Sequence, residues 1–256
     1  MANNLIVDIG NTRVKVAVVC GVEILCESLF GDCAELGAFV PKLVEEWGVE
    51  RAIVSSTRGV QSGVREVLEE FVADVVVFDA ATEVPMKNSY GTPDTLGRDR
   101  LAAAVGAAAI LDERGVAWSC VAIVDMGTAI TVDVVTKEGG FEGGTISPGV
   151  AMRFAALHQN TATLPLVEPS HEELLEAAEG VAKSTREAIV EGVLGGVAYE
   201  IDSRIVDLQK KFGEINVFLT GGDAKNFEKR IKNPIFASQV GVVSVGLNRI
   251  LEYNEK

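Results

Sequence analysis

Two short segments of this chain share one pattern, and they lie at matching places in its two halves. Residues 8–12 read Asp-Ile-Gly-Asn-Thr and follow the apolar residues 5–7, whereas residues 125–129 read Asp-Met-Gly-Thr-Ala and follow the apolar residues 121–124. Alternating apolar residues continue after each turn, so each segment is typical of two strands joined by a tight turn. The repetition predicts two similar lobes, each built around one such hairpin.

The residue types in the two turns indicate what they bind. Glycine lets a backbone approach a ligand closely, and the free N–H groups of such turns form concavities that bind anions. An Asp can hold the Mg²⁺ that accompanies phosphate. We therefore expect Asp8 and Asp125 to lie at one nucleotide held by the two lobes. The alternative is a pair of ordinary hairpins, because Asp and Gly are favoured in turns of any function.

The bulk composition favours a globular protein and argues against several classes of partner. With 256 residues and 48% apolar content the chain can bury a sizeable core. Its net charge of -14 argues against nucleic acid and anionic membranes as partners. The longest apolar run, residues 101–111, is too short to cross a bilayer. Because the N-terminus lacks the pattern of a signal peptide, we expect a cytoplasmic protein.

The four cysteines give no sign of a metal site. Cys20, Cys26, Cys33 and Cys120 show no Cys-x-x-Cys spacing and no partnering histidine. We expect them to be buried, reduced thiols.

Hydrophobic periodicity predicts an α/β fold with a mixed sheet and flanking helices in each half. In the first half we expect a hairpin over 5–19, a third strand around 23–25, helices over 34–47 and 60–71, strands over 51–55 and 75–78, and a long helix ending by 115. In the second half we expect a hairpin over 120–136, a strand around 141–146, helices over 150–158 and from 184 to about 211, a strand over 217–220 and a C-terminal helix over 242–253. The predicted lobes are residues 1–115 and 116–256.

Absent motifs narrow the chemistry. The sequence contains no Gly-x₄-Gly-Lys-Ser/Thr loop, no His-Glu-x-x-His, no Gly-x-Ser-x-Gly and no Gly-x-Gly-x-x-Gly after a strand. Carboxylates, glycine turns and a few cations are left, and they suit phosphoryl transfer, which depends on positioning and charge neutralisation. Lys15 could reach the nucleotide from the strand after the first turn, or it could simply face solvent.

The densest polar cluster is residues 90–100, immediately before and at the start of the Ala-rich helix. Asp99 lies between Arg98 and Arg100, and neighbouring cations keep a carboxylate ionised and oriented. Such a carboxylate suits a base that accepts a hydroxyl proton, and Arg100 could clamp the carboxylate of a substrate. The alternative is a solvated charge cluster at a helix start.

Glycines mark three further places. Gly221 and Gly222 follow an apolar strand, where a flat adenine could lie against backbone or the chain could simply turn. Residues 143–149 could likewise approach a substrate or form a turn. Gly192, Gly195 and Gly196 lie inside a predicted helix, where glycine is costly, so close helix packing, including packing across a dimer, is plausible.

Taken together these motifs resemble those of type III pantothenate kinases, in the same order and over nearly the whole chain. The matching segments are residues 8–12, Tyr90 with Pro93 and residues 97–100, residues 125–129 with Asp133, residues 144–149, residues 161–165 and residues 221–224. The resemblance implies the acetate and sugar kinase/Hsp70/actin fold, with two ribonuclease-H-like lobes and ATP in the cleft. It also implies ATP-dependent phosphorylation of pantothenate, the first step of coenzyme A biosynthesis, by a homodimer that uses Mg²⁺ and K⁺ or NH₄⁺.

The resemblance also implies roles for individual residues. ATP would be bound by Asp8, Ile9, Gly10, Asn11, Thr12, Arg13, Val14, Lys15 and Thr128, together with the Gly221 and Gly222 noted above. Mg²⁺ would lie near Asp8 through the phosphates, and Asp125 would bind the monovalent cation. Asp99 would accept the proton. Pantothenate would be held by Tyr90, Gly97, Arg98, Asp99, Arg100 and Thr185, with Thr185 acting within one subunit or across the dimer.

One position departs from the family pattern. Other members often carry a Thr or a small residue after the Asp-x-Gly-Asn-Thr motif, whereas this chain has Arg13. Arg13 is either one more cation beside the phosphates or a surface residue.

Two other functions stay open on the sequence alone. The chain could be a regulatory protein that kept the nucleotide site without catalysis, although it retains all three of Asp8, Asp99 and Asp125. It could also be a kinase of the same superfamily for another small molecule, although Arg100 should favour an alcohol that bears a carboxylate.

Overall fold

The computed structural model describes residues 2–58, 63–175, 181–238 and 240–255. The chain folds into two compact units. The first unit comprises Met1–Ala117, Glu138–Glu142 and Gly241–Lys256, and the second comprises Trp118–Lys137 and Gly143–Val240. Each unit contains one five-stranded sheet with flanking helices.

The sheet of the first unit has the strand order β3-β2-β1-β4-β5. Its strands are β1 (Asn4–Ile9), β2 (Val14–Cys20), β3 (Glu23–Phe30), β4 (Arg51–Ser56) and β5 (Asp74–Val77). The first three strands form an antiparallel meander, and β4 and β5 continue the sheet parallel to β1. The short turns after β1 and β2 permit the meander, whereas each parallel strand follows a helical crossover.

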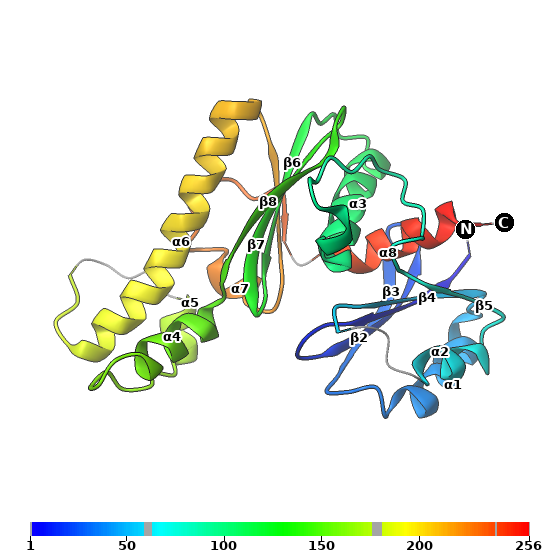
Figure 1. Ribbon diagram of the computed structural model, residues 1–256, viewed down its shortest axis with the longest axis horizontal. Coiled ribbons are helices and arrows are strands. Elements are labelled where there is room, and N and C mark those ends of the chain that lie inside the picture. The colour runs from blue at the N-terminus through cyan, green and yellow to red at the C-terminus, as the bar shows by residue number, and fades with distance from the viewer. Residues whose placement is uncertain (1, 59–62, 176–180, 239, 256) are drawn as a thin grey trace. The chain divides into compact units, whose positions relative to one another are not determined.

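Helices cover both faces of this sheet (Figure 1). Leu5, Val7 and Ile9 of β1 point into a core with α1 (Leu36–Trp47) and α2 (Val64–Glu69). Asn4, on the opposite face, donates a 2.8 Å hydrogen bond to Asn248 of α8 (Val242–Tyr253). On that face α8 packs closely against α3 (Arg98–Glu113).

The C-terminal helix α8 packs within the first unit, whereas the sequence assigned residues 116–256 to the second lobe. Two side chains explain the difference. Asn248 donates to the Gly21 carbonyl at 2.9 Å, and Arg51 of β4 donates to the Leu251 carbonyl at 3.0 Å. Buried polar groups need such partners, so these bonds fix α8 on the first sheet.

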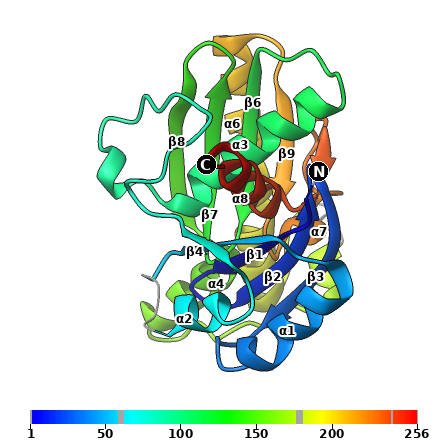
Figure 2. The same cartoon turned by 90° about the vertical axis from the view of Figure 1, so that its right-hand side faces the viewer.

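The sheet of the second unit repeats the plan, with strand order β10-β9-β6-β7-β8. Its strands are β6 (Cys120–Met126), β7 (Ala129–Thr136), β8 (Gly140–Pro148), β9 (Asn216–Thr220) and β10 (Ala237–Ser238). As in the first unit, the first two strands are antiparallel, and the last two run parallel to the first. Figure 2 shows β8, β7, β6 and β9 side by side with α6 behind them.

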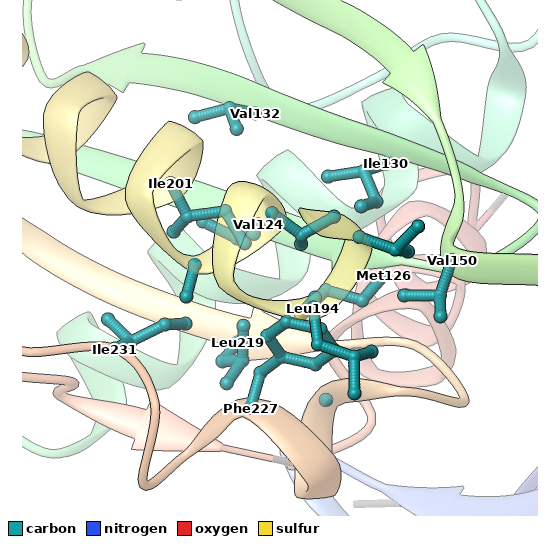
Figure 3. Close-up of a cluster of buried hydrophobic side chains, with 14 of the residues drawn as sticks. Val124, Met126, Ile130, Val132, Val150, Leu194, Ile201, Leu219, Phe227 and Ile231 are labelled. Atoms are coloured by element: carbon teal, nitrogen blue, oxygen red, sulfur yellow. The ribbon is translucent and has the colours of Figure 1, made fainter. Parts of the chain in front are cut away.

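The 28-residue helix α6 (Thr185–Phe212) supplies one side of the second core. Figure 3 shows Leu194 and Ile201 of this helix against Val124 and Leu219 of the sheet, with Phe227 of α7 (Ala224–Phe227) closing the cluster. Alternate residues of β6 enter this core, so Asp125 lies on the opposite face of the sheet from α6.

Most predicted elements are confirmed, with corrections at their ends. The first helix begins at Leu36 rather than at 34, and the predicted helix over 60–71 is described only as Val64–Glu69, because residues 59–62 lie outside the described residues. The sequence missed α7, β10 and the single turn Pro93–Thr95. The predicted helix over 150–158 is α4 (Val150–Gln159), and a further short helix, α5 (His171–Leu175), follows it in the chain.

The cysteines were predicted to be buried, reduced thiols. None of the four forms a disulfide, but only Cys120 is buried. Partial burial raises the pKa of Cys26 and the pKa of Cys33, and this disfavours their thiolates.

Candidate active site

The first glycine turn closes the hairpin between β1 and β2. Ile9 and Val14 form its last cross-strand pair, and Gly10 N donates a 3.0 Å hydrogen bond to the Arg13 carbonyl. Asn11, Thr12 and Arg13 form the tip of this turn, so Arg13 lies in the turn rather than on the strand. Amide, hydroxyl and guanidinium groups at a strand end can contact an anionic ligand.

Asp8, Lys15 and Ser55 lie side by side on one face of the first sheet. In the strand register Asp8 is paired with Lys15 of β2 and with Ser55 of β4. Their positions alternate with the α1-side core, so this is the face that carries α3 and α8. Lys15 Nζ also lies 3.3 Å from a carboxylate oxygen of Glu27 on β3.

Asp99 lies in the first turn of α3, where the positive end of the helix dipole stabilises an acidic side chain. Its Oδ1 accepts a 2.9 Å hydrogen bond from the Arg100 backbone N–H. Gly97 precedes the helix, and a Cβ built there would lie 2.5 Å from Asp99 Oδ1. The missing side chain at Gly97 therefore makes room for the carboxylate.

The two arginines beside Asp99 lie over aromatic rings. Arg98 Cζ is 5.8 Å from the Phe78 ring centroid. Arg100, which is only 9% exposed, has its Cζ 5.7 Å from the Tyr90 ring and 5.8 Å from the Phe141 ring. The cluster that sequence analysis could also explain as a solvated helix start is thus partly buried and packed against aromatic side chains.

The second glycine turn closes the hairpin between β6 and β7 and is one residue shorter. Met126 pairs with Ile130, and Gly127 N donates to the Ala129 carbonyl at 3.1 Å. The Thr128 carbonyl accepts a 3.0 Å bond from Gly149 N. A Cβ at Gly149 would overlap the backbone of this turn, so the segment 143–149 approaches the turn closely.

The glycine pair after β9 lies against the same turn. Gly221 has φ +93°, and a Cβ there would lie 2.5 Å from Asp125 Oδ1. Asp223 N donates to the Met126 carbonyl at 3.1 Å. Burial raises the pKa of Asp223. Gly221 and Gly222 therefore lie beside Asp125.

Thr185 is the first residue of α6 and is exposed. Ser184 caps the helix by accepting a hydrogen bond from Glu187 N. Next to it, Arg186 donates a 2.8 Å hydrogen bond to Glu173 of α5, and this bond lowers the pKa of Glu173. Thr185 is far from the second glycine turn in sequence but belongs to the same unit.

Each unit holds part of the predicted site. Residues 8–15, Tyr90 and residues 97–100 belong to the first unit, and Asp125, Thr128, Thr185, Gly221 and Gly222 belong to the second. Sequence reasoning missed Ser55 and Phe141, both fully buried. Ser55 lies near the end of an apolar strand and Phe141 follows two glycines, and neither sequence pattern predicts a functional residue.

The described residues contain no group of three or more metal-ligating side chains. Mg²⁺ in kinases is held by one or two carboxylates and by the substrate phosphates, so a single aspartate near a strand end, such as Asp8, fits it. The Asp125 carboxylate, which lies against Gly221, offers oxygen donors of the kind that bind hard cations. Among the described helices, none is both long and apolar enough to span a membrane.

Comparison with known proteins identifies the family. The family model described as type III pantothenate kinase matches residues 4–207. The chain belongs to the type III pantothenate kinase family. A type III pantothenate kinase of Phocaeicola vulgatus is 38% identical over 253 residues, covering 99% of each protein. Another, of Porphyromonas gingivalis, is 40% identical over 254 residues, covering 99% of this chain and 100% of the relative.

Solved structures confirm the fold class. Component A of the Acidaminococcus fermentans (R)-2-hydroxyglutaryl-CoA dehydratase has a TM-score of 0.57 at 16% identity and covers 100% of both chains. The ROK hexokinase of Thermus thermophilus has a TM-score of 0.52 at 16% identity, covering 98% of this chain and 100% of that one. Each of the two mixed sheets is therefore the core of one ribonuclease-H-like lobe in an actin-like ATPase fold.

The region matched by the type III pantothenate kinase model includes Asp8, Asp99, Asp125 and Thr185, but it ends before Gly221. The relatives just described extend over the glycine pair as well, because they cover nearly the full chain.

Proposed function

We propose that this type III pantothenate kinase transfers the γ-phosphoryl group of ATP to the primary hydroxyl of pantothenate, with Asp99 accepting the hydroxyl proton. As a member of this family the chain is an enzyme, a phosphotransferase that produces 4′-phosphopantothenate in coenzyme A biosynthesis. The observation that carries the residue assignment is the Asp99 carboxylate, held by the Arg100 backbone N–H beside the gap at Gly97.

The proton and phosphoryl transfers balance without a covalent enzyme intermediate. The pantothenate oxygen forms a bond to the γ-phosphorus while the bond from that phosphorus to the β–γ bridging oxygen breaks, and ADP leaves. The hydroxyl proton moves to Asp99. Phosphoryl transfer passes through a loose transition state, in which the nucleophile gains little charge early, so the orientation provided by Asp99 matters at least as much as its basicity.

ATP is assigned to the two glycine turns. Gly10 offers close backbone approach at the first turn, and Asn11, Thr12 and Arg13 present polar groups there. In the second unit, Thr128 contacts ATP and the Gly221–Gly222 backbone supplies a flat surface for adenine. The support is that these segments lie at strand ends in both units, the usual place of ligands in α/β sheets.

The cations follow from the carboxylates. Asp8 would hold Mg²⁺ together with the ATP phosphates, and Asp125 would hold K⁺ or NH₄⁺. Such cations neutralise charge on the phosphoryl oxygens when bound. The residues of the two glycine turns orient the phosphates through their N–H groups, and they limit water access when substrate is bound.

Pantothenate is assigned to the α3 start. Its carboxylate would pair with Arg100, its hydroxyl would lie at Asp99, and Tyr90, Gly97 and Arg98 would line its path. Thr185 completes the substrate contacts in the proposal, acting within one subunit or across a dimer.

A coupled assay of ADP release tests this proposal. The wild-type protein should release ADP only when pantothenate is present, and omission of K⁺ and NH₄⁺ should lower the rate. Asp99→Asn should lose at least about 10²-fold in kcat, the contribution of a positioned base, while ATP binding measured by calorimetry is kept. The control is Asp94→Asn, an exposed carboxylate in the same segment. An Asp99→Asn variant with near wild-type turnover would remove Asp99 from its role.

We also propose a homodimer formed through the surface of the second unit that carries β8, α4 and α6. Ile146, Met152 and Tyr199 expose 64%, 47% and 60% of their surface on β8, α4 and α6. Gly192 and Gly196 of α6 have open space where a Cβ would lie, so no contact with described residues accounts for glycine there. A second copy packed on this face would use the small residues and cover the apolar ones.

The oligomeric state decides the dimer proposal. Tyr199→Arg should shift the protein from dimer to monomer in light scattering after size exclusion. Tyr253→Arg, a comparably exposed tyrosine at the end of α8, should leave the mass unchanged. A wild-type monomer at assay concentration would refute the proposal.

The four cysteines, none of which forms a disulfide, further support the proposed cytoplasmic location, where thiols stay reduced.

A further inference from the structure

The segment after β7 packs within the first unit. Residues 138–142, which include the first residues of β8, are grouped with that unit, whereas β7 and the rest of β8 belong to the second. Phe141 N donates to the Lys87 carbonyl at 2.9 Å, and Ser89 N donates to the Phe141 carbonyl at 2.9 Å. Two backbone bonds thus hold the segment directly before Tyr90.

Side chains reinforce this pairing from both segments. Lys87 Nζ donates to the Glu138 carbonyl at 3.2 Å, and Ser89 Oγ donates to the Gly139 carbonyl at 3.1 Å. Gly140 has φ +76°, and a Cβ there would overlap the Lys87 carbonyl. Glycine is therefore required at this position for the close approach.

The pairing brings two rings to one guanidinium. The Tyr90 and Phe141 centroids are 5.9 Å apart at an interplanar angle of 67°. Arg100 Cζ lies 5.7 Å from the first ring and 5.8 Å from the second. Phe141 is fully buried, so the surrounding residues restrict the motion of its ring. A guanidinium packed against two steeply inclined rings has few orientations left.

Restricting Arg100 matters because of how arginine binds carboxylates. The planar guanidinium donates two parallel hydrogen bonds from its edge, and this fork works only in the right plane. The two aromatic rings contact the guanidinium without taking part in that fork. Arg100 is the side chain that the proposed function assigns to the carboxylate of pantothenate.

We propose that Phe141, held by the segment 138–142, positions Arg100 to recognise the substrate carboxylate. This inference rests on the proposed function of Arg100 and extends it to a residue that acts through another. Phe141 is a positioning residue: it touches Arg100 and Tyr90, and it determines selectivity for a carboxylate-bearing alcohol over the same alcohol without the charge.

The test compares pantothenate with pantothenol, in which a primary alcohol replaces the carboxylate. Phe141→Leu keeps apolar volume but removes the ring, and it should raise KM for pantothenate by about tenfold, the scale of a desolvated cation–π contact. Its kcat and its KM for ATP should change by less than about twofold, and kcat/KM for pantothenol should stay within the same range. The ratio of the two kcat/KM values therefore falls by about tenfold.

Two matched variants separate positioning from general packing. Phe141→Tyr keeps the ring and should restore most of the preference for pantothenate. Phe218→Leu removes another fully buried ring, which lies 5.3 Å from Phe236 in the second unit, and it should lower the melting temperature without changing the ratio. If Phe141→Leu does not fold, Phe141→Met provides the same test, because its flexible side chain refills irregular space.

The outcomes distinguish this inference from the proposed function. If Phe141→Leu lowers kcat/KM equally for both alcohols, or leaves the ratio at its wild-type value, the positioning role is refuted. If Arg100→Gln keeps the full preference for pantothenate, the assignment of Arg100 is refuted instead. A wild-type protein that phosphorylates neither alcohol would refute the proposed function itself.

Discussion

Gly97→Ala should damage catalysis by moving a single carboxylate. Gly97 has φ -56° and ψ 129°, a backbone that alanine adopts without strain. Its Cβ would lie 2.5 Å from Asp99 Oδ1, and ordinary contact begins at 3.4 Å, so the oxygen must move by about 0.9 Å. The next nearest atoms, on the Arg100 side chain, would be at 3.6 Å and need not shift.

A displacement of this size has a known scale of effect. A misplacement of about 1 Å at a reacting group can cost about 100-fold in rate, so we expect kcat to fall by about 30- to 100-fold. Rotation of the carboxylate also removes the hydrogen bond from the Arg100 N–H. KM for ATP should be nearly unchanged, because the turn after β1 is not touched by this substitution.

The assay is steady-state ADP release with pantothenate varied at saturating ATP, together with a thermal melt. Gly91→Ala is the matched control, since a Cβ at Gly91 in the same segment meets nothing within 4 Å. It should keep wild-type kcat. The reasoning fails if Gly97→Ala keeps kcat within about threefold of wild type while its melting temperature is also unchanged, since the carboxylate would then have room that the structure denies it.

Further predictions concern stability. Gly106→Ala should lower the free energy of unfolding by about 2 kcal/mol in urea denaturation, because its Cβ would overlap the backbone of α8 and overpacking outweighs the gain in helix propensity. Gly37→Ala, whose Cβ would make only ordinary contact, should instead raise it by about 0.5 kcal/mol. Burial raises the pKa of Glu200, but the hydrogen bonds from Ser147 and Arg153 together lower it by more. The pKa of Glu200 is therefore below its usual value. Such a group stabilises the fold above its unfolded pKa, and the contribution is lost as pH falls through the folded value. Glu200→Gln should therefore flatten the loss of stability below about pH 4.5 in urea titrations, and an unchanged acid limb would contradict this.

The hairpins were predictable because their determinants are local. A strand, a turn and a second strand that follow one another in the chain contain both partners of every cross-strand pair, as in the pairing of Ile9 with Val14. The helix start at Arg98 was also predictable, because Gly97 and an acidic first turn lie next to each other in sequence.

Contacts between distant segments were not predictable in the same way. Phe141 and Arg100 are separated by a whole hairpin, and neither residue indicates an aromatic–guanidinium contact by its neighbours. The docking of α8 on the first sheet depends on Asn248 meeting Asn4 at the other end of the chain. An amphipathic pattern shows that a helix packs somewhere, but the partner surface comes from the tertiary fold.

The two hairpins share a backbone plan but differ in charge, and this difference bears on the roles proposed for them. Asp8 stands opposite Lys15 in the strand register, whereas Asp125 stands opposite Thr131. Directly opposite residues share a face and interact. The Lys15 ammonium opposite Asp8 favours anionic phosphate, which brings its own Mg²⁺, whereas the neutral Thr131 opposite Asp125 adds no positive charge at the second turn. Arg13 adds to the positive side of the first turn. Charge alone thus favours the first turn for the phosphates with their own Mg²⁺ and the second for the monovalent cation.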